Sequence, residues 1–293
     1  PGTRAATVGP RTFVAGAGLM GHGIAQVLAA TGRAVALYEP EIGRAVAGRD
    51  RVAGNLDRAV AKGRLSADER AEIVGRITPT ADLAAARDVA LVVEAVFEDV
   101  DVKTTLWRQL DGIAPADAIF ATNTSSISID RLAAAVGAER RGRFVGMHFF
   151  SPVPVMPLIE LIRGSATTDA VEAAVRGLAA EMAKQVIVSA DRPGFIVNRI
   201  LMPFLAEAMR AYAEGLGTAD DIDTGARIGL NHPMGPLALA DFIGLDVCLG
   251  IMRVLHEGLG SPQFEPPQVL TDLVAAGHLG QKTGRGFHVY PRG

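Results

Sequence analysis

The sequence has a single cysteine, Cys248, among its 293 residues. One thiol excludes an intramolecular disulfide and is typical of a reducing compartment, so we expect a cytoplasmic protein. Because the neighbours of Cys248 are apolar, we interpret it as a packed core thiol and not as a nucleophile. Strong charge of one sign is also missing, since the formal net charge is -3. This value gives no electrostatic reason to expect nucleic acid or a membrane surface as a partner.

Long hydrophobic runs are missing as well. The longest apolar stretch with helical spacing, residues 195–213, is interrupted by Asn198, Arg199, Pro203, Glu207 and Arg210. Polar residues at this density exclude a membrane span and predict a buried helix. Residues 1–11 carry arginine but lack both acids and an apolar core, so we expect a disordered tail there and not a targeting peptide.

The sequence does contain a glycine-rich turn between a predicted strand and a predicted helix. An apolar run, residues 12–15, leads directly into Gly16-Ala17-Gly18-Leu19-Met20-Gly21. In this motif the first glycine permits the turn, the second lets the backbone approach phosphates, and the third lets helix and strand pack closely. A second predicted strand, residues 34–38, ends at Glu39, where an acid can bind the ribose hydroxyls. We therefore assign NAD to Gly16, Gly18, Leu19, Met20, Gly21 and Glu39.

Strands and helices continue to alternate as far as residue 190. Apolar runs predict further strands at residues 91–93, 118–121, 144–148 and 158–162. Such alternation is typical of an α/β fold with a doubly wound, mainly parallel sheet of Rossmann type. A helical hairpin, residues 42–76, is inserted after the second strand. Beyond Asp191 the pattern is helical, so we expect an NAD-binding domain over residues 12–190 and an all-α domain over residues 191–293.

Polar side chains follow the ends of the predicted strands, where open α/β sheets bind their ligands. These side chains are Glu39, Glu94, Asn123, Ser125 and His148. His148 is the first candidate for acid–base chemistry, because an imidazole titrates near neutral pH. Glu160 lies in a predicted buried strand, where a carboxylate needs a partner. That partner is either His148, as in an acid–base pair, or an arginine such as Arg163.

Other polar residues leave structural alternatives open. Ser125 either caps a helix or contacts a ligand. Asn198 is an amide within an apolar helix, so it must hydrogen-bond another helix or a substrate carbonyl. Basic residues predominate between Arg44 and Arg64, which suits a solvated helix face or a site for a phosphate-bearing substrate. The remaining histidines have no metal-ligand spacing, so we predict no metal site; they are His22, His232, His256, His278 and His288.

Several motifs in this order resemble the L-3-hydroxyacyl-CoA dehydrogenase family, of the 3-hydroxybutyryl-CoA dehydrogenase type, over nearly all of residues 11–290. They are Gly16-x-Gly18-Leu-Met-Gly21-x-Gly23-Ile-Ala, Asn123-Thr-Ser-Ser, His148-Phe-Phe-Ser-Pro-Val-Pro, Pro193-Gly-Phe-Ile-Val-Asn198-Arg, His232-Pro-Met-Gly-Pro236 and Lys282-Thr-Gly-Arg-Gly-Phe287. The resemblance implies reversible oxidation of a short-chain L-3-hydroxyacyl-CoA by NAD. It also implies a homodimer joined through the helical domain.

The resemblance also implies a role for each matching residue. His148 matches the catalytic base and Glu160 its paired carboxylate, while Ser125 and Asn198 match residues that orient the substrate. The cofactor contacts implied in addition to the glycine loop are Glu98, Lys103 and Asn123, and Lys62 matches a contact to coenzyme A. Three residues depart from the family pattern: Ser151 replaces an asparagine, Pro157 a lysine, and Glu39 an aspartate. The first two departures put the choice of substrate in doubt.

Two other functions compete with this one. A dehydrogenase of the lambda-crystallin or gulonate type acts on a hydroxy acid without coenzyme A, but the basic hairpin and His232-Pro-Met-Gly-Pro236 argue against it. A non-catalytic NAD-binding module is the other alternative, and the intact His148 and Glu160 argue against that function.

Overall fold

The computed structural model describes residues 8–291. The chain forms two compact units, Pro1–Arg192 and Pro193–Gly293. Most of the expected N-terminal tail lies outside the described residues, whereas Arg11 already belongs to the first strand. Among the described residues, none of the helices combines the length and the apolar character needed to cross a membrane.

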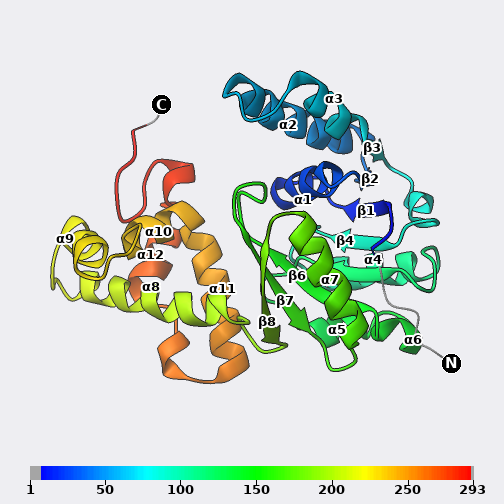
Figure 1. Cartoon of the computed structure of the whole chain (residues 1–293). Coiled ribbons are helices and arrows are strands. Elements are labelled where there is room, and N and C mark those ends of the chain that lie inside the picture. The colour runs from blue at the N-terminus through cyan, green and yellow to red at the C-terminus, as the bar shows by residue number, and fades with distance from the viewer. Residues whose placement is uncertain (1–7, 292–293) are drawn as a thin grey trace. The chain divides into compact units, whose positions relative to one another are not determined.

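The first unit is built on an eight-stranded sheet in the order β3-β2-β1-β4-β5-β6-β7-β8 (Figure 1). The strands are β1 (Arg11–Ala15), β2 (Ala34–Tyr38), β3 (Ile77–Thr80), β4 (Leu91–Glu94), β5 (Ile119–Thr122), β6 (Phe144–Phe149), β7 (Leu158–Arg163) and β8 (Gln185–Ala190). Adjacent strands are parallel except for the antiparallel pair β6 and β7. The strand order reverses between β1 and β4, which is where folds of this type bind dinucleotides. The predicted Rossmann-type sheet is confirmed.

Helices connect these strands. They are α1 (Leu19–Ala30), α2 (Ile42–Ala61), α3 (Ala67–Gly75), α4 (Val100–Asp111), α5 (Ile129–Ala133), α6 (Ala138–Arg141) and α7 (Asp169–Glu181), with the short helix η1 (Leu83–Ala86). Figure 1 shows α2 and α3 side by side, as the predicted inserted hairpin. Ser66 and Glu69 form a capping box at the start of α3. The strand β3 after the hairpin was not predicted, because its sequence, with Pro79 between two threonines, is more typical of a turn than of a strand.

The second unit is helical, as predicted. Its elements are α8 (Val197–Ala213), α9 (Ala219–Thr224), η2 (Gly225–Gly229), α10 (Pro236–Ile243), α11 (Leu245–Leu259), η3 (Pro262–Phe264), α12 (Gln268–Ala275) and η4 (Gln281–Thr283). Met202, Leu205 and Met252 lie in its apolar core together with Cys248. Cys248 is 0% exposed, so the interpretation as a packed core thiol is confirmed, and burial raises the pKa of the thiol to about 12.

Two buried aspartates hold the end of the chain on this core. Asp223 accepts hydrogen bonds from the backbone N–H of Leu237 and from Nε2 of the His288 ring, at 2.8 and 2.7 Å. Asp241 accepts the N–H of Phe287 at 3.0 Å. A side chain in place of Gly235 or Gly286 would collide with these carboxylates. The two C-terminal motifs found in the sequence therefore include glycines because the backbone closely approaches buried acids.

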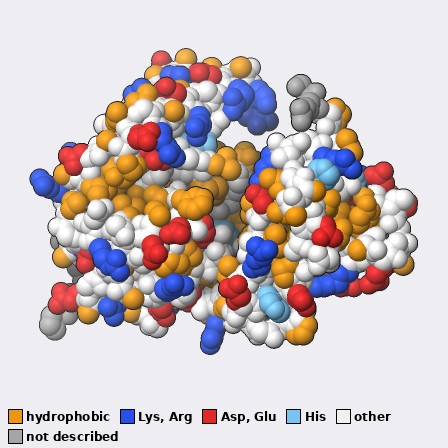
Figure 2. Space-filling model, turned by 180° about the vertical axis from the view of Figure 1, so that it is seen from behind, with side chains coloured by type: hydrophobic (Ala, Val, Ile, Leu, Met, Phe, Trp, Pro, Cys, Tyr) orange, Lys and Arg blue, Asp and Glu red, His pale blue; other side chains and the backbone are white. Residues whose placement is uncertain are grey.

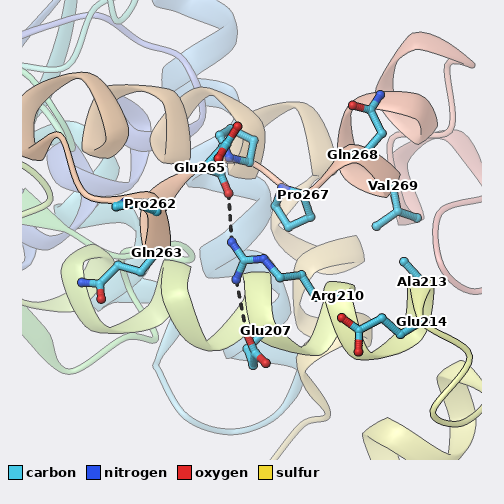
Figure 3. A pocket seen from close by; sticks show the side chains of 11 residues that line it. Glu207, Arg210, Ala213, Glu214, Pro262, Gln263, Glu265, Pro267, Gln268 and Val269 are labelled. Carbon is cyan, nitrogen blue, oxygen red and sulfur yellow. Dashed lines mark hydrogen bonds and ion pairs between the residues drawn. The ribbon is translucent and has the colours of Figure 1, made fainter.

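A shallow cavity of about 650 Å³ lies between α8 and the segment that follows α11 (Figure 3). Arg210 crosses it, paired with Glu207 at 3.3 Å and donating to the carbonyl oxygen of Glu265 at 3.1 Å. The guanidinium is therefore occupied by groups of the protein itself.

Candidate active site

The glycine loop between β1 and α1 forms a cradle of bare backbone. Gly16 has a φ of +100°, and a Cβ there would lie 2.4 Å from the carbonyl oxygen of Ala95. A Cβ on Gly21 would lie 1.8 Å from the carbonyl oxygen of Gly16. At Gly18, by contrast, a Cβ would meet none of the described atoms within 4 Å. The loop is thus tightly packed inside and open at the helix N-terminus, where an anion binds most favourably.

Glu39 directly follows β2, next to this cradle, and is only 8% exposed. Its Oε1 accepts the backbone N–H of Ala17 at 2.8 Å, which ties the end of β2 to the glycine loop. Its Oε2 lies 3.7 Å from Nε of Arg44, in the first turn of α2. The acid expected at the ribose therefore lies beside the phosphate cradle.

His148 and Glu160 face each other across the antiparallel strands β6 and β7. Nδ1 of His148 lies 3.0 Å from Oε2 of Glu160, and the two residues are 7% and 0% exposed. The ring of Phe150 lies 4.6 Å from that of His148. Arg163 forms ion pairs with Asp169 and Glu172, so the alternative pairing of Glu160 with Arg163 is wrong. The strand register brings a buried carboxylate and an imidazole into contact, which is the arrangement of an acid–base pair.

The loop that carries Ser125 is held by Glu98. One oxygen of Glu98 accepts the backbone N–H of Ser125 at 3.0 Å and the hydroxyl groups of Thr124 and Ser126 at 2.5 and 3.2 Å. Ser128 is the N-cap of α5, so Ser125 does not have the capping role that we considered. The position of Ser125 therefore depends on a carboxylate from the neighbouring loop.

Lys103 joins Glu98 to a second, deeper carboxylate. Lys103 is only 1% exposed. Its ammonium group lies 3.0 Å from a carboxylate oxygen of Glu98 and 2.6 Å from one of Glu94. Glu94 also accepts the hydroxyl of Thr122 at 2.7 Å. Complete burial raises the pKa of Glu94 above its usual value, against the opposing effect of Lys103. Burial also acts on Glu98, but Lys103 and the hydrogen bonds from the Ser125 loop lower its pKa. These ion pairs were not predicted from the sequence.

Two sequence families cover almost the whole chain. The 3-hydroxyacyl-CoA dehydrogenase NAD-binding domain matches residues 11–192, and the C-terminal domain of the same enzymes matches residues 194–290. The chain belongs to the 3-hydroxyacyl-CoA dehydrogenase family. It is therefore an NAD-dependent enzyme with an acyl-CoA substrate, and the two competing functions are set aside.

Individual relatives agree with this assignment. A 3-hydroxybutyryl-CoA dehydrogenase from Bradyrhizobium diazoefficiens is 46% identical over 285 residues, which cover 97% of each chain. The human mitochondrial hydroxyacyl-coenzyme A dehydrogenase is 40% identical, covering 94% of this chain and 90% of the human one. The crystal structure of (S)-3-hydroxybutyryl-CoA dehydrogenase from Ralstonia eutropha has a TM-score of 0.94 and 43% identity, covering 98% of this chain and 100% of that one.

The residues of this dehydrogenase fit the cofactor of the family. The cradle at Gly18 leaves room for a pyrophosphate, and Glu39 lies within contact of the same loop. Asn123 accepts the N–H of Phe149 at 2.9 Å through its side-chain oxygen and so links the ends of β5 and β6. Lys103 is enclosed by two carboxylates, and its direct contact with the cofactor stays a prediction.

Two predicted substrate residues lie on helices. Lys62 is the C-cap of α2 and is exposed at the end of the basic hairpin. Figure 2 shows a group of Lys and Arg side chains over the tip of this hairpin. Asn198 belongs to the second unit, where it lies in the first turn of α8 and is 7% exposed. Their roles toward the substrate stay predictions.

Lys184 is a further residue that sequence reasoning missed. Its ammonium group donates to the carbonyl oxygens of Val153 and Met156, at 2.6 and 2.7 Å, and burial lowers its pKa. Helix α1 packs on the same loop, because Gly23 leaves space for Val153. This loop connects the strands of His148 and Glu160 and contains the departures at Ser151 and Pro157. The position of this lysine directly before the strand β8 was the one feature of the sequence that could have suggested its burial.

Proposed function

We propose that this dehydrogenase interconverts short-chain L-3-hydroxyacyl-CoA, 3-hydroxybutyryl-CoA above all, and the 3-ketoacyl-CoA, with His148 as the general base. The buried pair of His148 and Glu160 at the carboxyl edge of the sheet is the observation that carries the proposal. When bound, NAD accepts the hydride from C3 of the substrate. His148 takes the proton of the 3-hydroxyl during oxidation and returns it during reduction.

The surrounding residues prepare this proton transfer. Glu160 holds Nδ1 of His148 at 3.0 Å, which fixes the orientation of the ring and places a negative charge beside the group that takes up the proton. Ser125 and Asn198 hydrogen-bond the oxygen at C3 and orient the reacting carbon, where small errors of position are costly. Glu39 binds the ribose hydroxyls of NAD, and the glycine loop binds its pyrophosphate.

The decisive assay follows NADH absorbance with acetoacetyl-CoA, free acetoacetate and a long-chain 3-ketoacyl-CoA. We expect rapid oxidation of NADH with acetoacetyl-CoA and little with the free acid, because the acid lacks the coenzyme A group. Equal rates with acetoacetyl-CoA and acetoacetate would contradict a CoA enzyme. A preference for the long-chain substrate would overturn the short-chain assignment only.

Coenzyme A binds to the basic hairpin through its phosphates in this proposal. Replacement of Lys62 by alanine should raise KM for acetoacetyl-CoA about tenfold or more, because a charge-assisted contact is lost, and should leave KM for NADH nearly unchanged. Added salt should reduce the difference, since exposed charges are screened within about 10 Å at 0.1 M. Kinetics at low and high salt measure both effects.

Arg176, exposed on α7, provides the matched control for Lys62. Its replacement by alanine removes the same charge from the first unit but leaves the hairpin intact. If Lys62→Ala and Arg176→Ala change KM for acetoacetyl-CoA equally, the hairpin is a solvated surface and not a coenzyme A site.

We also propose a cytoplasmic homodimer joined through the second unit. The single cysteine supports the location. Exposed apolar side chains support the interface: Leu216 is 80% exposed, Ile228 78% and Leu230 63%. Sedimentation should give twice the mass of one chain, and Ile228→Asp should reduce it to that of one chain. A single-chain mass for the unaltered protein would contradict the dimer.

A further inference from the structure

Arg44 lies beside Glu39, at the position where NAD has a ribose 2′-hydroxyl and NADP has a 2′-phosphate. Its Nε lies 3.7 Å from Oε2 of Glu39, and its side chain is 66% exposed. This separation is longer than a hydrogen bond, so the contact is an ion pair without a shared proton. Only the arginine of this pair is exposed, since the Glu39 side chain is 11% exposed, but the long separation keeps the free energy of the contact small. Arg44 can therefore turn from Glu39 to a ligand at small cost.

The chemistry of the two side chains is opposite. An acid at the end of the second strand accepts hydrogen bonds from the ribose hydroxyls of NAD, whereas an arginine nearby accommodates the 2′-phosphate of NADP. The planar guanidinium group binds phosphate through two parallel hydrogen bonds and stays charged at all relevant pH values. Glu39 supplies the first feature and Arg44 the second, within contact of each other.

The attachment of Glu39 makes the two features compatible. One oxygen of Glu39 is held by the N–H of Ala17 in the glycine loop, so the carboxylate stays at the end of β2. Arg44 comes from the first turn of α2, and its side chain is 66% exposed. The guanidinium is therefore accessible to a phosphate on the ribose.

We propose that Arg44 is a subsite for the ribose 2′-phosphate, so that the enzyme binds NADP(H) as a second, weaker cofactor. The inference rests on the proposed position of Glu39 at the ribose. Glu39 favours NADH by repelling the phosphate, and Arg44 partly offsets that repulsion. The ratio of the two affinities is set by this pair of side chains.

The test is direct binding of NADH and NADPH, followed by nicotinamide fluorescence without acyl-CoA. We expect NADH to bind at least about tenfold more tightly than NADPH to the unaltered enzyme. Arg44→Ala should raise Kd for NADPH about tenfold, since a hydrogen-bonded charge is lost, and should change Kd for NADH less than about twofold. Added salt should reduce the NADPH effect.

Glu39→Gln is the second variant, and together with Arg44→Ala it completes a double-mutant cycle. The amide oxygen can still accept the N–H of Ala17, but the negative charge is gone. This variant should bind NADPH at least about tenfold more tightly than the unaltered enzyme. The gain should be smaller when Arg44→Ala is added, because part of it comes from the guanidinium that Glu39 no longer pairs with. Arg51, exposed two turns further along α2, is the control for a general loss of charge.

The outcomes separate the two assumptions. If Arg44→Ala affects NADPH no more than NADH, or no more than Arg51→Ala does, the phosphate subsite is wrong. If Glu39→Gln leaves the affinities for both cofactors unchanged, Glu39 is not at the ribose and the proposed cofactor site itself is wrong. Because no acyl-CoA is present, neither result depends on the substrate.

Discussion

Replacement of His148 by glutamine should lower kcat for acetoacetyl-CoA reduction by about 10²–10⁴-fold, the usual contribution of a general acid–base group. Glutamine can keep a hydrogen bond to Glu160, but it cannot carry a proton to the substrate. NADH affinity should be unchanged, because the glycine loop and Glu39 are untouched. Steady-state kinetics and NADH fluorescence measure the two quantities on the same preparation.

Replacement of the paired carboxylate gives an independent check. Glu160→Gln, which keeps the shape but loses the charge, should lower kcat at least about tenfold. If His148→Gln retains more than about a tenth of the original kcat, the proton passes through Ser125 or water instead.

Replacement of Lys103 by methionine should destabilise the first unit by about 3–5 kcal/mol, because Glu94 and Glu98 then lose the buried ammonium group with which both are paired. The loss should grow with pH. Burial raises the pKa of Glu94 above 4.5, so the folded state binds more protons than the unfolded state above that pH. Stability therefore falls as pH rises from about 4.5 through the raised pKa of Glu94. The fall is steeper in the variant, because the positive charge of Lys103 no longer opposes the effect of burial. Urea unfolding at several pH values measures the slope.

Lys184→Met is the matched control for Lys103→Met. Lys184 is also buried, but both of its hydrogen-bond acceptors are neutral carbonyl oxygens. Losing these hydrogen bonds should cost about 1–3 kcal/mol, with little change between pH 5 and 7. If Lys103→Met shows the same pH-independent loss as Lys184→Met, Glu94 and Glu98 are not held by the charge of Lys103.

Local patterns in the sequence were sufficient for the outline of the fold. The glycine motif from Gly16 to Gly21, the apolar strands and the capping box at Ser66 depend on backbone conformation over a few residues, so they can be found without knowledge of the rest of the chain. The strand β3 escaped detection because its residues, Ile77–Thr80, have only a weak strand pattern and gain order by pairing with β2.

The tertiary structure decided which distant side chains meet. His148 and Glu160 were both identified from the sequence, but only the antiparallel register of β6 and β7 selects this pair over Arg163. The placement of Lys103 between Glu94 and Glu98 likewise depends on a strand end, a loop and a helix folding together. Residue types and local periodicity determine the elements, whereas the partners of buried charges depend on how separate segments pack. A buried charge must find a partner, but the sequence alone does not say which one.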